Sequence, residues 1–220
     1  MFISQPEEEA NQLPILAMKD RTTRALDAIP VEAKGVTQHA VKVVAARLTR
    51  LGHRKSVFKT DVEPAILALE EEVISAAPHL GLIPQEPPKG ESQSNGEMEG
   101  AVREISRQVR CLKDALDYRY KTIVDSRHPI MTWLVEHSTA LLNRFSVGRD
   151  GRTAYELIYG KPYRRPLAEF GEKIWYQPLK PSSSRQNKME PRWHEGLFVG
   201  IREKSDEAMV MTPKGVFRCR

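Results

Sequence analysis

Apolar residues in the first 80 positions form short continuous runs separated by helical periods. Runs at 13–18 and 24–31 predict two adjacent strands joined by a polar turn. A helical period over 36–52, closed by a glycine, predicts the first helix. A third strand is predicted at 54–61, and a second helix, opened by a proline, at 63–77. This order predicts an α/β fold in which helices cover a mixed sheet of the α+β kind.

The middle of the chain contains the longest regular pattern. Residues 84–95 hold three prolines and predict a loop. From Met98 to Leu116 apolar residues recur at spacings of 4, 3, 4, 3 and 4, which predicts a long amphipathic helix. Two further helices are predicted at 128–146 and 153–159.

The last 55 residues have the pattern of a small β-rich unit. We expect Trp175, Tyr176 and Trp193 in its core, with base stacking as the alternative. The polar segment 181–188 predicts a linker or long hairpin loop. We therefore divide the chain into a core at 1–165 and a basic, β-barrel-like unit at 166–220. Short strands are predicted at 172–179, 196–201, 208–213 and 216–220.

Composition narrows the function classes. No apolar run approaches the roughly 18 residues that a membrane span needs, so we expect no membrane partner. Two cysteines, Cys111 and Cys219, provide neither a disulfide framework nor a zinc cluster. Residues 1–100 carry 11 basic and 15 acidic side chains, whereas residues 161–220 carry 13 and 7. A net charge of +6 in this last segment favours a polyanion-binding surface in the second half.

Asp61 ends the third predicted strand just before a helix. An aspartate at this position can cap the helix that Pro64 opens. Alternatively, an acid at the carboxyl end of a strand, on the rim of a sheet, is placed to bind Mg²⁺. The sequence leaves both interpretations open.

Two acids lie at the start of the long helix. Glu97 completes an S-x-x-E capping box with Ser94, which is sufficient to explain it. Glu99 has no such explanation. At about 100° per residue, Arg103, Ser106 and Arg110 follow Glu99 within about 40° of one line, with Arg107 alongside. One reading is a solvated face with a Glu99–Arg103 pair; the other is a metal-binding acid beside a basic track for a phosphate backbone.

Two of these motifs together resemble the integrases of retroviruses and LTR retrotransposons. VFKTDVEPA supplies Asp61 and QSNGEME supplies Glu99, 38 residues later, behind a Pro/Gly-rich loop. The tail, including GRTAYELIYGKP and RWHEGLFVGI, resembles copia-type polyproteins. The resemblance implies an RNase H-like core with helices on both faces. It also implies DNA integration by a polynucleotidyl transferase in which Asp61 and Glu99 are catalytic and hold Mg²⁺ or Mn²⁺.

One part of the family pattern is missing. The first catalytic aspartate of the family lies on the first strand, and residues 1–12 contain no aspartate. Asp20 follows the second strand and is not the metal ligand, and Asp27 lies one strand too late. The family's amino-terminal zinc-binding segment is also absent. We expect either a fragment of a longer polyprotein that begins just after the first ligand or a decayed copy, with weak or no strand transfer.

The resemblance also implies the partners. We expect binding to DNA, at element ends and target, homo-oligomerisation of the full-length protein, and a nuclear location with a cytoplasmic stage. A non-catalytic, host-retained nucleic-acid-binding module derived from a transposon is an alternative function, and a plain RNase H-like nuclease is a third. The candidate DNA-binding residues are Arg103, Arg107, Arg110 and Lys113 on the long helix and Lys161, Arg164 and Arg165 beyond the core.

Overall fold

A β-hairpin lies at the centre of the amino-terminal half. Its strands are β2 (Ile15–Lys19) and β3 (Leu26–Pro30), which pair antiparallel over five positions, and β1 (Phe2–Ile3) pairs with the other edge of β2. All but the last residue of β3 are buried, because both faces of the hairpin are covered. The computed structural model describes residues 2–3, 14–85, 96–178, 189 and 191–219.

A second, smaller sheet consists of two parallel strands. β4 (Ser56–Lys59) pairs with β5 (Leu82–Gln85), and α2 (Pro64–Ala76) and a short 3₁₀ helix (Pro78–Leu80) connect them. The predicted loop therefore starts too early, since Pro84 and Gln85 belong to β5. A proline is compatible with this strand because it lies at a sheet edge. Within the described ranges, no strand pairing joins β4 or β5 to the hairpin.

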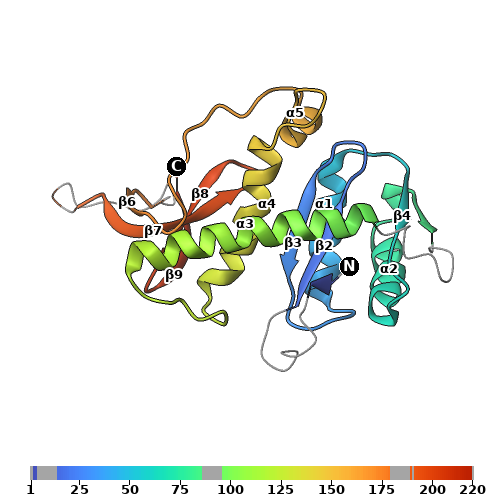
Figure 1. The fold of residues 1–220 in the computed structure, drawn as a ribbon, viewed down its shortest axis with the longest axis horizontal. Coiled ribbons are helices and arrows are strands. Elements are labelled where there is room, and N and C mark those ends of the chain that lie inside the picture. The colour runs from blue at the N-terminus through green and yellow to red at the C-terminus, as the bar shows by residue number, and fades with distance from the viewer. Residues whose placement is uncertain (1, 4–13, 86–95, 179–188, 190, 220) are drawn as a thin grey trace.

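Helices cover both faces of the hairpin, as the resemblance implies (Figure 1). α1 (Gln38–Leu51) and α2 pack on the face that contains Leu16 and Ile29. α3 (Gly96–Tyr120) and α4 (Ile130–Phe145) pack on the opposite face, against Ala17 and Ala28. The two faces separate in this way because successive strand residues point to opposite sides. None of the helices in the described part of the chain combines the length and the apolar character that a membrane crossing requires.

α3 runs along most of the molecule (Figure 1). Its 25 residues span about 37 Å at the usual rise per residue. Ala101 and Ile105, in its first half, belong to the core of the hairpin, whereas Leu116 packs with α4 and the carboxy-terminal sheet. One continuous helix therefore joins the two hydrophobic regions. The short α5 (Ala154–Tyr159) follows α4 and begins with a capping box between Thr153 and Glu156.

The carboxy-terminal unit is a four-stranded antiparallel sheet in sequential order. A single bridge between Pro178 and Cys219 connects its two edges. Closure into a barrel-like unit and the boundary at residue 165 stay predictions. The segment 181–188 lies outside the described residues. The strands are β6 (Lys173–Tyr176), β7 (His194–Arg202), β8 (Glu207–Thr212) and β9 (Gly215–Cys219).

The prediction that three aromatic residues lie in the core of this unit is wrong for two of them. Tyr176 is buried, but the exposed fractions of Trp175 and Trp193 are 64% and 55%. Trp175 lies on an edge strand opposite the exposed Glu195, and Trp193 immediately precedes β7. Sequence alternation identified the strand but could not show which of its faces the helices cover.

Buried charges link the core to the carboxy-terminal sheet. Asp27 on β3 pairs with Arg50 at 2.8 Å and Arg47 at 3.7 Å, both on α1. Each arginine also contacts Glu203, which follows β7, and Arg47 reaches Glu136 on α4 at 3.3 Å. Asp27 thus has a structural role, as the shared partner of two arginines of α1.

Candidate nucleic-acid and acidic site

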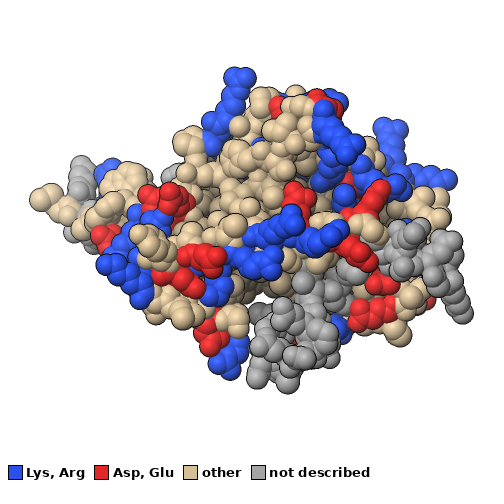
Figure 2. Space-filling view, viewed as in Figure 1, with Lys and Arg blue, Asp and Glu red and all other residues tan. Residues whose placement is uncertain are grey.

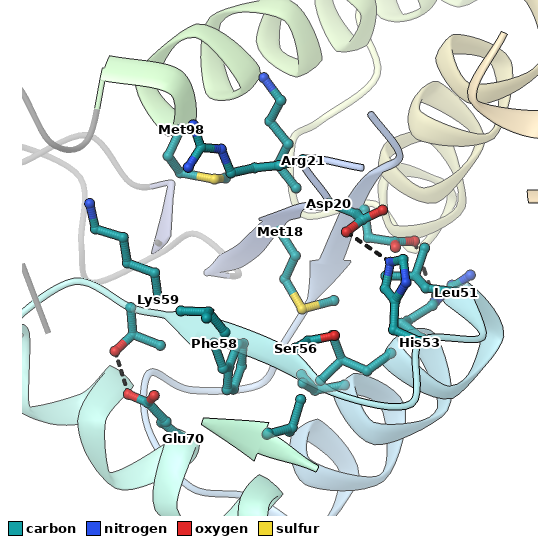
Figure 3. A pocket seen from close by; sticks show the side chains of 18 of the residues that line it. Met18, Asp20, Arg21, Leu51, His53, Ser56, Phe58, Lys59, Glu70 and Met98 are labelled. Atoms are coloured by element: carbon teal, nitrogen blue, oxygen red, sulfur yellow. Dashed lines mark hydrogen bonds and ion pairs between the residues drawn. The ribbon is translucent and has the colours of Figure 1, made fainter. Parts of the chain in front are cut away.

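A pocket of about 750 Å³ lies between the hairpin and the small parallel sheet. Met18 on β2 and Phe58 on β4 face it from opposite sides, and Met98 at the start of α3 closes part of its rim (Figure 3). β2 and β4 belong to separate sheets, so no backbone hydrogen bonds join them. The space between the two strands is therefore lined by side chains and stays open as a pocket.

An Asp–His pair occupies one end of the pocket (Figure 3). His53 Nε2 lies 3.1 Å from Asp20 Oδ1, and Thr23 donates to Asp20 Oδ2 from its backbone N–H at 2.8 Å and its hydroxyl at 2.6 Å. Partial burial raises the pKa of Asp20, but the hydrogen bonds from Thr23 and His53 outweigh it and lower that pKa below its usual value. Asp20 is therefore a fixed, ionised turn residue.

Asp61 lines the same pocket, just beyond the end of β4. Its Oδ1 accepts a hydrogen bond from the N–H of Val62 at 2.9 Å. The residue at the amino-terminal cap of α2 is Glu63, whose side chain makes no capping hydrogen bond. The capping interpretation of Asp61 is therefore wrong, because the chain takes two more residues to enter the helix. Metal binding by Asp61 stays a prediction.

The two acids of α3 are placed differently from each other. Glu97 lines the pocket and pairs with Arg21 at 2.9 Å, while Glu99 is exposed and is not among the lining residues. Both members of the Arg21–Glu97 pair are more than half exposed, so the pair contributes little to stability. Ser94, the proposed partner of Glu97 in a capping box, lies outside the described residues. Asp61 and Glu97 therefore both line the pocket, whereas Glu99 does not.

This arrangement does not match a preformed two-metal centre. No group of three or more His, Cys, Asp or Glu side chains in the described part of the chain is placed to hold a metal ion. A two-metal mechanism needs carboxylates that converge on both ions. Asp61 instead contacts its own loop, and Glu97 pairs with an arginine.

The predicted basic track is present on the surface of α3. Arg103, Arg107 and Arg110 are exposed, and none of them has an acidic partner within 4.0 Å among the described residues. The predicted Glu99–Arg103 pair is likewise not formed there. Lys and Arg side chains gather over the middle of α3 (Figure 2). Spacings of three and four residues place these arginines on one side of the helix, so their fields add.

The other predicted cations are less available or lie elsewhere. Lys113 forms an i,i+4 pair with Asp117 at 2.6 Å and is half-buried, so its charge is offset locally. Lys161 and Arg164 are exposed after α5, and Arg165 lies 4.0 Å from Asp206. Nothing tests their binding role, which stays a prediction.

Comparison with solved structures supports the fold. A scan against protein-family models and a search of curated proteins find no match. The chain is similar to one in the cryo-EM structure of the simian T-cell lymphotropic virus intasome in complex with PP2A regulatory subunit B56 gamma: the TM-score is 0.50 and the identity 14%, over 100% of this chain and 73% of that one.

Two catalytic cores show lower similarity. The BIV integrase catalytic core domain gives a TM-score of 0.45 and 17% identity, over 68% of this chain and 88% of that one. The HTLV-2 integrase catalytic core domain in complex with magnesium, in a trimeric form, gives 0.45 and 11%, over 72% and 91%. At these identities the likeness concerns fold alone: the chain has a mixed α/β fold, similar to that of the intasome chain.

Several pocket residues could not be found from the sequence. His53 contacts Asp20 from 33 positions away, and Glu70 on α2 is buried and accepts a hydrogen bond from the Thr60 hydroxyl (Figure 3). Glu70 lies in a run of three glutamates that predicts a solvated face. The one feature of the sequence that could have indicated the burial of Glu70 is its place on the helix, directly after the core residue Leu69.

Proposed function

We propose that the chain is an integrase-like polynucleotidyl transferase core that binds DNA through the arginine track of α3 and has little strand-transfer activity by itself. The observation that carries the proposal is the exposed row of Arg103, Arg107 and Arg110 on α3. The mixed α/β fold and its likeness to a chain of an intasome support the same function.

The arginine track suits a phosphate backbone for a physical reason. Arginine is charged at every relevant pH and presents several donors in a planar fork that matches phosphate oxygens. Side chains three or four residues apart repeat along the helix by about 5 Å, so several phosphates can be engaged at once. These contacts position a duplex without reading its sequence.

The acids support only a limited catalytic role. Asp61 and Glu97 line the pocket and Glu99 does not, so a two-metal reaction would need a rearrangement of α3 or a further acid. Residues 1–12 provide no aspartate for this purpose. Asp61 and Glu99 remain the proposed ligands for Mg²⁺ or Mn²⁺ from the sequence motifs.

DNA binding can be tested by its salt dependence. Replacing Arg103, Arg107 and Arg110 by Ala should reduce the magnitude of the slope of log K against log salt by about 2.7, since each phosphate contact contributes about 0.9. Fluorescence anisotropy with a labelled 20-base-pair duplex, between 50 and 300 mM KCl, measures this slope. A matched control removes the same charge from another surface: Arg202, Lys204 and Lys214 are also exposed and are replaced by Ala. Equal slopes for both triple variants would show a net-charge effect and would remove the track from the proposal.

A second candidate function is a non-catalytic nucleic-acid-binding module. The lack of a group of three ligand side chains among the described residues favours it, because a binding module needs the arginines and not the acids. Incubation of the purified chain with nicked and end-mimicking duplexes in Mg²⁺ or Mn²⁺ distinguishes the two. We expect almost no product. Robust joining that Glu99→Gln abolishes would overturn the limit on activity and exclude the binding module.

A further inference from the structure

Two tryptophans lie exposed on the carboxy-terminal sheet. Trp175 on β6 is directly opposite Glu195 of β7, and Trp193 is two residues before Glu195 in the chain. Their exposed fractions are 64% and 55%. In the described part of the chain, neither indole ring stacks on another aromatic ring or lies beneath a cation. The third tryptophan, Trp133 on α4, is instead half-buried against the hydrophobic cluster that contains Leu134 and Phe170.

This exposure is costly unless a partner uses it. A tryptophan side chain presents a large apolar surface, and neighbouring exposed aromatics mark interaction sites more often than isolated ones do. β6 is the first strand of its sheet, and among the described residues nothing buries more than about a third of Trp175, whose exposed fraction is 64%. The hydrophobic interior of the sheet is already provided by Tyr176, Val210 and Cys219.

The charge around the tryptophans indicates an anionic partner. The exposed Lys173 lies two residues before Trp175, and the exposed Arg192 directly precedes Trp193. Glu195 is the one acid directly opposite Trp175. Two exposed cations beside two exposed aromatic side chains suit a flexible polyanion that also presents flat apolar faces.

We propose that Trp175 and Trp193, flanked by Lys173 and Arg192, bind single-stranded DNA by stacking on unpaired bases. Every base offers a π-face to an indole ring, and the two cations lie where the phosphates of such a strand would run. A duplex cannot use these rings, because its bases are already stacked on one another. Self-association through the rings is opposed by the net charge of +5 on each chain.

This surface is separate from the duplex track. β6 lies at the end of the molecule opposite β4 and α2 (Figure 1), whereas Arg103, Arg107 and Arg110 lie around the middle of α3. The inference rests on the proposed function only in its choice of DNA as the strand. A chain with both surfaces could hold a duplex on α3 and an unpaired end on the β6–β7 edge.

Binding of a 15-mer of deoxythymidine tests the proposal. Anisotropy of a labelled oligonucleotide gives the affinity, and intrinsic fluorescence reports directly, since the chain has only three tryptophans. We expect quenching on binding. Trp175→Ala and Trp193→Ala should each weaken the affinity about tenfold, and the Phe variants at the same positions should retain most of it. Phe217→Ala is the matched control, an aromatic residue that is 40% exposed on β9 of the same sheet.

Each outcome has a definite meaning. An affinity unchanged in the Trp175/Trp193 double variant, or lowered equally by Phe217→Ala, overturns the proposal. Binding of oligouridine alone would overturn the choice of DNA. A concentration-dependent dimer in sedimentation that the double variant abolishes would assign the surface to a second copy. The triple α3 variant should keep its oligonucleotide quenching, so failure of the duplex track and failure of this surface are distinguishable.

Discussion

His137 makes the stability of the chain depend on pH in a way that one substitution can isolate. It lies on α4 with 3% exposure, between the rings of Phe170 at 5.5 Å and Phe198 at 5.6 Å. Its Nδ1 is buried and has no hydrogen-bond partner among the described residues. Burial, with a smaller contribution from the positive charge of Arg144, lowers the pKa of His137 from 6.5 to about 4.

The sign of the effect follows from linkage. The unfolded chain binds a proton near pH 6.5, while the folded chain resists it until about pH 4. The contribution of His137 to stability is therefore complete above pH 6.5 and is lost as the pH falls towards 4. From these two values the loss is about 2 kcal/mol at pH 5 and about 3 kcal/mol at pH 4.

Other buried groups act in the opposite direction. Burial, with the nearby negative charge of Glu203, raises the pKa of Asp27 to about 6, against the attraction of Arg50 and Arg47. Burial likewise raises the pKa of Glu136. Both acids favour the folded state at low pH, and for Asp27 this contribution is lost as the pH rises through about 6. The net pH profile of the wild type therefore understates the effect of His137.

The assay compares wild type with His137→Phe by urea unfolding at pH 7.5, 6, 5 and 4.5. The ring of phenylalanine is close in size to imidazole and suits neighbours that are already aromatic. The difference in unfolding free energy between variant and wild type should shift by about 2 kcal/mol in favour of the variant between pH 7.5 and 5. His79→Gln, on the surface, controls for the loss of one imidazole. A difference independent of pH would refute the reasoning.

Two further substitutions test polar contacts between separate helices and strands. The Asn143 side chain accepts a hydrogen bond from the N–H of Leu26 at 2.8 Å and donates one to the Leu26 carbonyl at 2.7 Å. Asn143→Leu leaves these two buried backbone groups unpaired, so the free energy of unfolding should fall by about 2–3 kcal/mol, as measured by urea unfolding. Asn143→Asp, which keeps only the acceptor, should not restore the wild-type value. Arg50→Met should cost about 3–5 kcal/mol, because Asp27 and Glu203 lose a shared partner in a buried site. Combining it with Asp27→Asn should recover part of the loss, and strictly additive effects would contradict the coupling.

The sequence predicted where helices and strands occur better than it predicted which residues surround each of them. Every predicted helix is present within a few residues, because a helix carries its own period and its own end signals, such as Gly52 at the end of α1. β5 was not predicted, because its residues, which include Pro84, have neither alternation nor a β-branched run and are mostly exposed. Strand β6 was found, yet the exposure of Trp175 was not, because burial depends on what packs above the sheet.

The candidate site shows the same division. The motif spacing selected Asp61 and Glu99, and the helical angle selected Arg103, Arg107 and Arg110, all from local pattern and resemblance. The structure confirms that these arginines are exposed and shows that Asp61 does not cap α2. It also places Glu97 rather than Glu99 in the pocket, since the side of α3 that contains Met98 is the one that packs on the hairpin.

The sequence by itself determined the helices, most of the strands, the basic second half and the row of arginines, because periodicity and charge are properties of neighbouring residues. Only the tertiary structure decided which groups meet: Asp27 with Arg50, Asp20 with His53, and His137 with two phenylalanine rings. The physical reason is that burial and pairing depend on contacts between residues far apart in the chain. Those contacts set the pKa values, the pocket and the exposed tryptophans.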